Sequence, residues 1–191
     1  MKRKEKIVES ATGLFAVQGF DATTTLQIAL KSGVTEPLIY YHFAGKDELF
    51  THILENSFNQ YFSKLFDLPK NSTTEFDRIT NLFEMHFQII DELPEMMRLI
   101  VSSCPAKLYD PESLCRQHYK KARQLLFDYF KECLMRGIKK DEFHKLPVNG
   151  TANMLVALIN GLIRQLIFKK GDIDGVKEAT IEFCHRALLP I

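Results

Sequence analysis

The residues between positions 23 and 46 carry the side-chain types that proteins use to contact DNA. Hydroxyl, carboxylate, phenol, imidazole and ammonium groups all occur within this short stretch. Such groups contact phosphate oxygens or form hydrogen bonds with base edges in the major groove. The stretch reads as two short helices joined by a turn at Ser32-Gly33-Val34, and a third helix follows at once. Because a helix-turn-helix presents its second helix to the major groove, the pattern predicts recognition of DNA.

This stretch resembles the N-terminal domain of TetR-family transcription regulators. The residues in register are Ile28-Ala29, Gly33-Val34, Tyr40, His42-Phe43, Lys46 and Leu49. The resemblance implies a DNA-binding regulator, and a repressor by family habit. It further implies a helix-turn-helix domain over residues 1–46, joined by a long fourth helix to a helical effector-binding and dimerisation domain over residues 47–191.

The resemblance also assigns the residues that contact DNA. They are Lys2, Arg3, Lys4, Thr24, Thr25, Leu26, Thr35, Glu36, Pro37, Leu38, Tyr40, Tyr41, His42 and Lys46. Tyr40 and Lys46 are the expected phosphate contacts. Three positions that are often polar or glycine in the family are apolar here, namely Leu26, Pro37 and Leu38, so we expect few direct hydrogen bonds to bases and some dependence on DNA shape. Glu36 can accept a hydrogen bond only from cytosine N4 or, less well, from adenine N6.

The overall charge of the chain gives little support to the prediction of DNA binding. The net charge of the 191-residue chain is +1, and residues 1–50 carry six basic and six acidic side chains. Electrostatic attraction to DNA must therefore be local. Plain structural roles also fit several residues: Tyr40 and Phe43 could pack in the core, Leu26 and Leu38 could be ordinary surface residues, and the basic N-terminus could simply be solvated.

Helical periodicity recurs along nearly the whole chain, and strand signals are scarce. The pattern predicts an all-α fold of about nine helices. Their expected ranges are 3–18, a helix capped by Thr24 or Thr25, a helix opening at Thr35, 46–66, 74–93, 94–103, 111–136, 149–170 and 173–189. Gly19, Gly137 and Gly171-Asp172 are expected to end helices, and Pro105–Pro111 to form a loop.

The segment 74–93 is apolar nearly all round, which predicts a helix in the middle of a bundle. In the family that the chain resembles, this helix walls a cavity for an effector, and the phenylalanine and methionine content favours a small apolar or aromatic one. The candidate lining residues are Phe62, Phe66, Phe83, His86, Phe87, Met96, Met97, His118, Tyr119 and Phe127. The same stripe could be plain core, with His86 a buried histidine that has no ligand role.

The last two helices have an apolar surface too broad for one side of a small bundle. The candidate dimer residues are Leu155, Leu158, Ile159, Leu162, Leu166, Ile181, Cys184 and Leu188. Gly161 would allow two backbones to approach closely. Two such hairpins predict a homodimer with a four-helix isologous interface. A dimer would read a near-palindromic operator whose half-sites lie about 34–36 Å apart or a multiple of that distance.

Other classes of protein find little support in the sequence. It has no Gly-rich phosphate loop, no Gly-x-Ser-x-Gly, no His-Glu-x-x-His and no Cys-x-x-Cys pair, so we expect no catalysis, cofactor or metal. The segment 154–168 looks too short and too polar for a membrane span, and no secretory signal begins the sequence, so a cytoplasmic protein is expected. Two alternatives remain: a DNA-binding protein without a ligand switch, and a helical carrier of apolar molecules that has lost operator binding.

Overall fold

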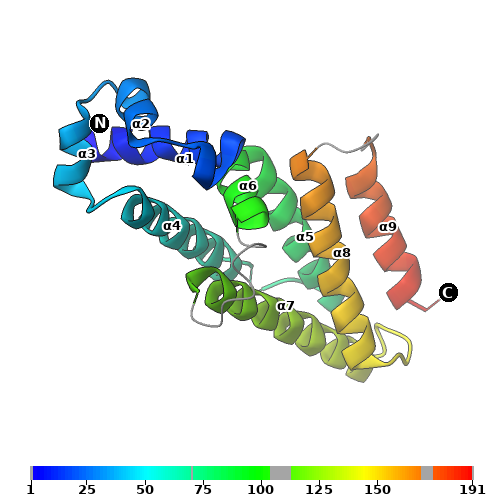
Figure 1. The fold of residues 1–191 in the computed structure, drawn as a ribbon. Helices are drawn as coiled ribbons and strands as arrows, with labels where there is room; N and C mark the ends of the chain where they lie inside the picture. The colour runs from blue at the N-terminus through cyan, green and yellow to red at the C-terminus, as the bar shows by residue number, and fades with distance from the viewer. Residues whose placement is uncertain (1, 70, 104–112, 169–173, 191) are drawn as a thin grey trace. The chain divides into compact units, whose positions relative to one another are not determined.

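The computed structural model describes residues 2–69, 71–103, 113–168 and 174–190. Within these ranges the chain forms nine α-helices and no strand, as predicted (Figure 1). The helices are α1 (Arg3–Ala22), α2 (Thr25–Ser32), α3 (Glu36–His42), α4 (Lys46–Phe66), α5 (Glu75–Glu92), α6 (Pro94–Ser103), α7 (Leu114–Lys139), α8 (Val148–Phe168) and α9 (Val176–Leu188). Cys104, the expected loop at Pro105–Pro111 and the expected break at Gly171-Asp172 lie outside the described residues.

The helices divide into two compact units. The first comprises residues 1–61 and 93–119, and the second comprises residues 62–92 and 120–191. The functional boundary expected at residue 46 falls inside the first unit. Helices α4 and α7 each contribute residues to both units.

In the first unit, α1 packs against α2, α3 and α6 (Figure 1). Its buried face carries Ile7, Ala11 and Phe15, and Phe15 joins an aromatic cluster with Phe20 and Phe50. Gly19 takes φ 83° and interrupts the helix, a backbone conformation that favours glycine. The break that the sequence predicts at Gly19 is therefore present, although a last turn continues beyond it.

In the second unit, α5 packs against α8 and α9. Many side chains of α5 are buried, and they include Ile79, Leu82, Phe83, Ile89 and Ile90. The helix is not apolar nearly all round, as the sequence suggested, because Gln88 is exposed and Glu84 half-buried on its polar side. Phe83 also contacts Phe130 of α7, with their ring centroids 5.9 Å apart. This helix therefore forms the core of the unit in which an effector is expected.

The N-terminus of α5 is held by charged side chains from α5 and from the segment after α7. Glu142 accepts hydrogen bonds from the backbone N–H groups of Glu75 and Phe76 at 2.9 and 2.6 Å. The Glu75 carboxylate is itself buried and lies 3.3 Å from Arg78 Nη1 and 2.7 Å from Lys140 Nζ. We call Glu75, Arg78, Lys140 and Glu142 the α5 clamp.

The expected end of α7 at Gly137 is wrong. Helix α7 continues to Lys139, and the Gly137 carbonyl then accepts from the backbone N–H groups of Glu142 and Phe143 at 2.9 and 3.2 Å. The ring of Phe143 is buried against the Cα of Gly137, where any side chain would collide with it. The glycine is thus required for packing inside the helix, a role that the sequence does not distinguish from a helix stop.

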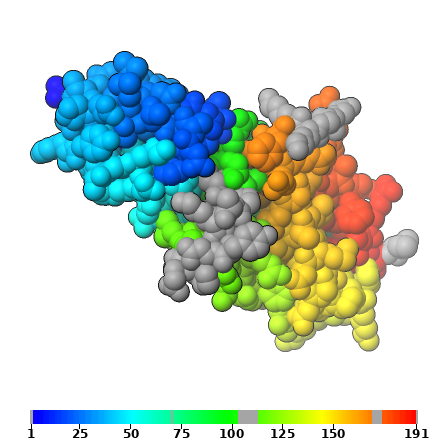
Figure 2. Space-filling model, in the orientation of Figure 1, coloured from blue at the N-terminus to red at the C-terminus, as the bar shows by residue number. Residues whose placement is uncertain are grey.

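Helix α8 begins at Val148, one residue before its expected start, and the last two residues of its expected range lie outside the described residues. By length and composition alone it could cross a membrane, a test that the core helix of a soluble protein also passes. One side of α8 packs within the unit through Ala152, Val156, Ile159 and Ile163. The other side reaches the surface, where its side chains are coloured yellow to orange in Figure 2.

Candidate DNA-reading surface

Local sequence signals build the turn between α2 and α3. Thr24 caps α2: its hydroxyl accepts from Gln27 N at 3.2 Å, while Thr24 N donates to Gln27 Oε1 at 2.9 Å. This reciprocal pair is a capping box. At the other end Gly33 is left-handed, with φ 66° and ψ 34°, and Val34 N donates to Ala29 O at 3.0 Å. The turn geometry predicted from Ser32-Gly33-Val34 is therefore present.

Helix α3 is anchored on one side and exposed on the other. Ile39 and Phe43 are buried, whereas Tyr41 is 81% exposed and Tyr40 is 54% exposed. Of the alternatives that the sequence left open, Tyr40 is thus a surface residue and Phe43 a core residue. Leu26 of α2 is also at the surface, 55% exposed.

The other residues predicted to contact DNA are at least partly accessible to solvent. Those exposed are Lys2, Arg3, Lys4, Thr24, Thr35 and Pro37, and those half-buried are Thr25, Glu36, Leu38, His42 and Lys46. Thr35 occupies the N-cap position of α3, but its side chain makes no capping hydrogen bond. The Lys4 ammonium lies 5.0 Å from the centroid of the Phe43 ring. The basic N-terminus is therefore held beside α3.

One hydrogen bond links the two helices of the motif through predicted DNA-contact residues. Thr25 Oγ1 donates to Glu36 Oε1 at 2.5 Å, and the hydroxyl of Tyr40 lies 3.5 Å from Thr25 Oγ1. The carboxylate at the start of α3 is thus fixed to the start of α2.

Lys46 lies where its ammonium can stabilise the corner between α1 and α2. Nζ donates to Phe20 O and to Thr23 O, both at 2.9 Å, and stands 4.3 Å from the centroid of the Phe20 ring. The last turn of α1 contains no basic residue of its own. A cation is favourable beside the carbonyls at a helix C-terminus, so Lys46 supplies from α4 the charge that α1 lacks. Two of its three N–H donors are used inside the protein, and one remains for the expected phosphate.

Replacing Lys46 by methionine is expected to lower the free energy of unfolding by about 1–2 kcal/mol, because two carbonyls lose a charged donor. Denaturant unfolding of the two proteins measures this loss. Lys6→Met serves as a control, since Lys6 is exposed on α1 and its change should be within about 0.5 kcal/mol. Equal stability of both variants would show that the ammonium does not support the corner. The salt dependence of operator binding separately reports the phosphate contact, whose loss reduces the slope by about 0.9.

Two further residues at the same corner, Gln18 and Gln27, were not predicted from the sequence. Gln18 Nε2 donates to Ala22 O at 3.0 Å and to Gln27 Oε1 at 3.0 Å. The spacing of Thr24 and Gln27 is a capping-box signature that would have identified Gln27. Nothing local marks Gln18, because its contact with Gln27 depends on how the following helix packs.

The predicted effector residues are divided between the two units. In the second unit Phe62, Phe83, His86 and Phe87 are buried and Phe127 is half-buried, but Phe66 is 58% exposed. In the first unit Met96 and Met97 are buried, Tyr119 is at the surface, and His118 stacks on Phe58 with centroids 4.8 Å apart. A common cavity for these residues stays a prediction.

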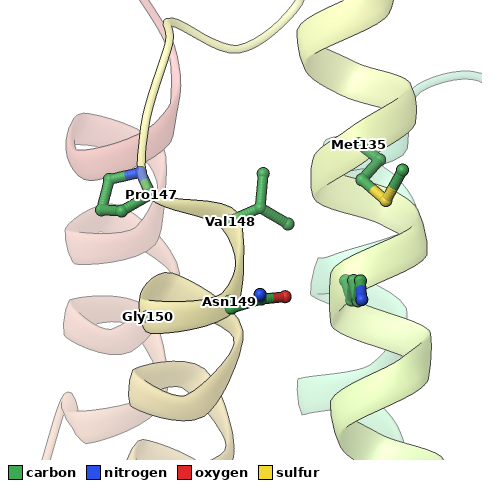
Figure 3. A pocket seen from close by; sticks show the side chains of 6 residues that line it. Met135, Pro147, Val148, Asn149 and Gly150 are labelled. Atoms are coloured by element: carbon green, nitrogen blue, oxygen red, sulfur yellow. The ribbon is translucent and has the colours of Figure 1, made fainter.

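Two pockets formed by described residues lie elsewhere in the second unit. One, of about 420 Å³, lies between the end of α7 and the start of α8. Figure 3 shows Val148 and Asn149 pointing from α8 toward α7, where Met135 lies. The other, of about 510 Å³, lies between α8 and α9 and is lined almost wholly by apolar side chains, among them Met154, Leu158 and Phe183.

His86 lies in the interior of α5, and its Nδ1 donates to Leu82 O at 2.7 Å. Burial lowers the pKa of His86 to about 4, although this hydrogen bond opposes the shift. The folded protein thus holds a neutral imidazole that the unfolded chain protonates near pH 6.5. The stabilisation is fully present above pH 6.5 and is lost as the pH falls from 6.5 toward 4.

Lowering the pH from 7 to 4 is therefore expected to remove about 3 kcal/mol of stability through His86. His86→Asn removes the titration while its amide can replace the Nδ1 donor. The difference between the unfolding free energies of the two proteins, measured at several pH values, isolates this contribution from the other histidines. A difference that does not change with pH would contradict the assignment.

Burial changes which side chains are available for a dimer interface. Leu155, Ile159, Leu162, Cys184 and Leu188 are buried within the single chain. Burial raises the pKa of the Cys184 thiol to about 11, so the thiol stays protonated at neutral pH. Leu158, Leu166 and Ile181 are half-buried. The apolar stripe predicted for dimerisation thus belongs largely to the core of the second unit, and its exposed neighbours are Met154, at 66%, and Phe183, at 57%.

Comparison with known proteins supports the interpretation of the N-terminal helices. Residues 7–53 match the family described as bacterial regulatory proteins, tetR family. YfiR of Bacillus subtilis (strain 168), an uncharacterized HTH-type transcriptional regulator, is 23% identical over 188 residues, which cover 93% of this chain and 88% of YfiR. The HTH-type transcriptional repressor KstR2 of Mycobacterium tuberculosis (strain CDC 1551 / Oshkosh) is 29% identical over 89 residues, covering 47% of this chain and 44% of KstR2. The second alignment thus spans less than half of that relative.

Solved structures share the fold over nearly the whole chain. The ketosteroid transcriptional regulator KstR2 of Mycobacterium tuberculosis matches with a TM-score of 0.78 and 20% identity, covering 100% of this chain and 96% of KstR2. FadR of Bacillus subtilis, solved in complex with stearoyl-CoA, matches with a TM-score of 0.69 and 17% identity, covering 94% of this chain and 96% of FadR. At these identities the likeness establishes the fold. The relatives and structural neighbours named here are transcription regulators rather than enzymes.

Proposed function

We propose that this chain, whose residues 7–53 match the family described as bacterial regulatory proteins, tetR family, is a DNA-binding regulator that acts as a homodimeric repressor. In this proposal it acts in the cytoplasm on a near-palindromic operator. It leaves the operator when a small apolar or aromatic effector binds the helical domain over residues 47–191.

The observation that carries the proposal is the exposed face of α3. Ile39 and Phe43 anchor the helix, while Tyr40, Tyr41 and Pro37 are free to enter a major groove. Lys2, Arg3 and Lys4 extend the same surface with three cations, which suits them to flanking phosphates.

A dimer is supported by the exposed apolar surface on α8 and α9. Met154, Ala157 and Leu158 on α8 lie beside Phe183 and Ala187 on α9, around the pocket of about 510 Å³. Two copies related by a two-fold axis would bury this surface against itself. Gly161 is exposed on the same helix with open space where a side chain would stand, so a partner backbone could approach there.

An apolar effector is supported by the side chains of α5 and by the neighbours. Phe83 and Phe87 bring aromatic rings into the interior of the second unit, and His86 is held neutral there. One structural neighbour is named a ketosteroid regulator and another was solved with stearoyl-CoA; a ketosteroid is largely apolar, and stearoyl-CoA carries a long apolar acyl chain. We therefore propose a ligand of this class, bound in the domain over residues 47–191.

Selection of binding sites from random duplex DNA by the purified protein, at near-physiological salt, tests the proposal. An enriched palindrome is expected, with affinity falling about 0.9 log units per tenfold rise in salt for each phosphate neutralised. Light scattering at micromolar concentration should give the mass of a dimer.

Each alternative predicts a different result in these experiments. An enriched site from which no apolar compound releases the protein would favour a DNA-binding protein without a ligand switch. Absence of any enriched site, with tight binding of apolar compounds, would favour a carrier that has lost operator binding. A monomer in light scattering would overturn the dimer.

A further inference from the structure

We propose that Glu36, held in place by Thr25, gives the protein a preference for cytosine at one position of each operator half-site. This inference rests on the proposed binding of an operator. It concerns a specificity-determining residue and one positioning residue in contact with it.

The geometry tethers one oxygen of the Glu36 carboxylate to α2. Thr25 Oγ1 donates to Glu36 Oε1 at 2.5 Å, across the turn that joins α2 to α3. Both ends of α2 are themselves fixed, because Thr24 and Gln27 cap its start and Gly33 closes the turn that leads to α3. A carboxylate that is already held by a hydrogen bond loses less conformational freedom when it binds a base.

Hydrogen-bond directions show what the surface offers to DNA. A carboxylate only accepts, so the Thr25 hydroxyl must give its proton to Glu36. In the 3.5 Å contact between Thr25 and Tyr40, the phenol must therefore be the donor. Tyr40 thus donates to Thr25, and Thr25 donates to Glu36. The second oxygen of the Glu36 carboxylate remains able to accept a hydrogen bond, and it has no proton to donate.

Three side chains on these two helices carry no hydrogen-bond donor. Leu26 and Pro37 are exposed apolar residues, and Leu38 is a half-buried one. The start of α3 therefore presents a fixed negative acceptor framed by apolar groups. A base that contacts it must donate a hydrogen bond into the major groove.

Only cytosine and adenine present such donors, through N4 and N6 respectively. Adenine N6 lies between two acceptors, its own N7 and the O4 of the paired thymine, and both repel a carboxylate. Cytosine N4 has an acceptor on one side only, the O6 of the paired guanine. Guanine and thymine offer acceptors alone. The order of preference is therefore cytosine, then adenine, with guanine and thymine rejected.

Binding-site selection with four full-length proteins tests the inference: the unchanged chain, Glu36→Gln, Thr25→Val and Glu9→Gln. Glu9 is an exposed acid on α1, so its variant controls for the loss of one negative charge. Glutamine can donate to adenine N7 and accept from N6, so Glu36→Gln should change the preferred base from cytosine to adenine, by about tenfold. Thr25→Val, which replaces the hydroxyl by a methyl group, should weaken the cytosine preference about threefold.

The outcomes separate this inference from the proposed function. An operator that is selected equally by the unchanged chain and Glu36→Gln, with the same bases throughout, would overturn the inference and leave the proposed function intact. An unaltered base preference in Thr25→Val would overturn the positioning by Thr25. Selection of no site by the unchanged chain would overturn the proposed operator binding and the inference together. Circular dichroism of each variant confirms that the fold is retained.

Discussion

Glu75→Gln is expected to lower the free energy of unfolding by about 3 kcal/mol, because it leaves the guanidinium of Arg78 buried without its counter-charge. Arg78 has a side-chain exposure of 15%, and its Nε already has no hydrogen-bond partner in the part of the chain that the structure describes. The neutral amide cannot replace the carboxylate that faces both Arg78 and Lys140. Thermal unfolding should show a midpoint roughly 6–12 °C lower.

The matched control for Glu75→Gln is Glu132→Gln. Glu132 pairs with Arg136 one turn along α7, and both side chains are about half exposed. An exposed pair of this kind contributes about 0.5 kcal/mol or less. If the two variants lost equal stability, the burial of the α5 clamp would not explain how much the clamp contributes to the free energy of unfolding. The Lys140 side chain, at 59% exposure, adds less to the clamp than Arg78 does.

Gly137→Ala is expected to destabilise the protein by about 2–3 kcal/mol through overpacking. An added Cβ would lie 2.1 Å from Cδ2 and 2.3 Å from Cε2 of Phe143. The ring is rigid and almost wholly buried, so it cannot swing away without opening the core. Alanine is otherwise the better helix former, which makes the sign of the change diagnostic. Denaturant unfolding measures it.

Gly150→Ala is the control for this substitution. Gly150 lies in the first turn of α8, and an added Cβ would meet Pro147 at 3.9 Å, an ordinary contact. This variant should be neutral or stabilised by up to about 1 kcal/mol. Adding Phe143→Leu to Gly137→Ala should recover part of the loss, since the shorter side chain vacates the space. If Gly137→Ala left the free energy of unfolding unchanged, Phe143 would not be packed rigidly against α7.

The elements predicted correctly are those whose signals are local. Thr24, Gly33 and Pro94 mark ends of α2 and α6 through capping and backbone preferences that act within a few residues. The range of α4 likewise follows from an uninterrupted helical pattern between two breaks. Such features depend on chain neighbours, so the sequence contains them.

The features that the sequence could not supply depend on contacts between distant residues. Lys46 carries the charge expected of a phosphate contact, but its use as the cap of α1 depends on the docking of α4 beside Phe20. Gly137 is a residue type that often ends helices, but in this protein it is needed where Phe143 packs against α7. The apolar stripe on α8 is wide enough to pack both within its own unit and against a second surface. Periodicity alone does not show that Ile159 faces the core while Met154 faces outward.

The first unit is not one continuous piece of chain, which restricts how such regulators can exchange parts. Residues 93–119 belong to the same compact unit as residues 1–61, and α6 packs on α1 beside Gly13, where a Cβ would lie 3.3 Å from Glu95 Oε1. A fusion that carried only residues 1–61 into another protein would strip α6 from α1 and expose apolar surface. Recombination between paralogues that kept this unit intact would need junctions after residues 61, 92 and 119.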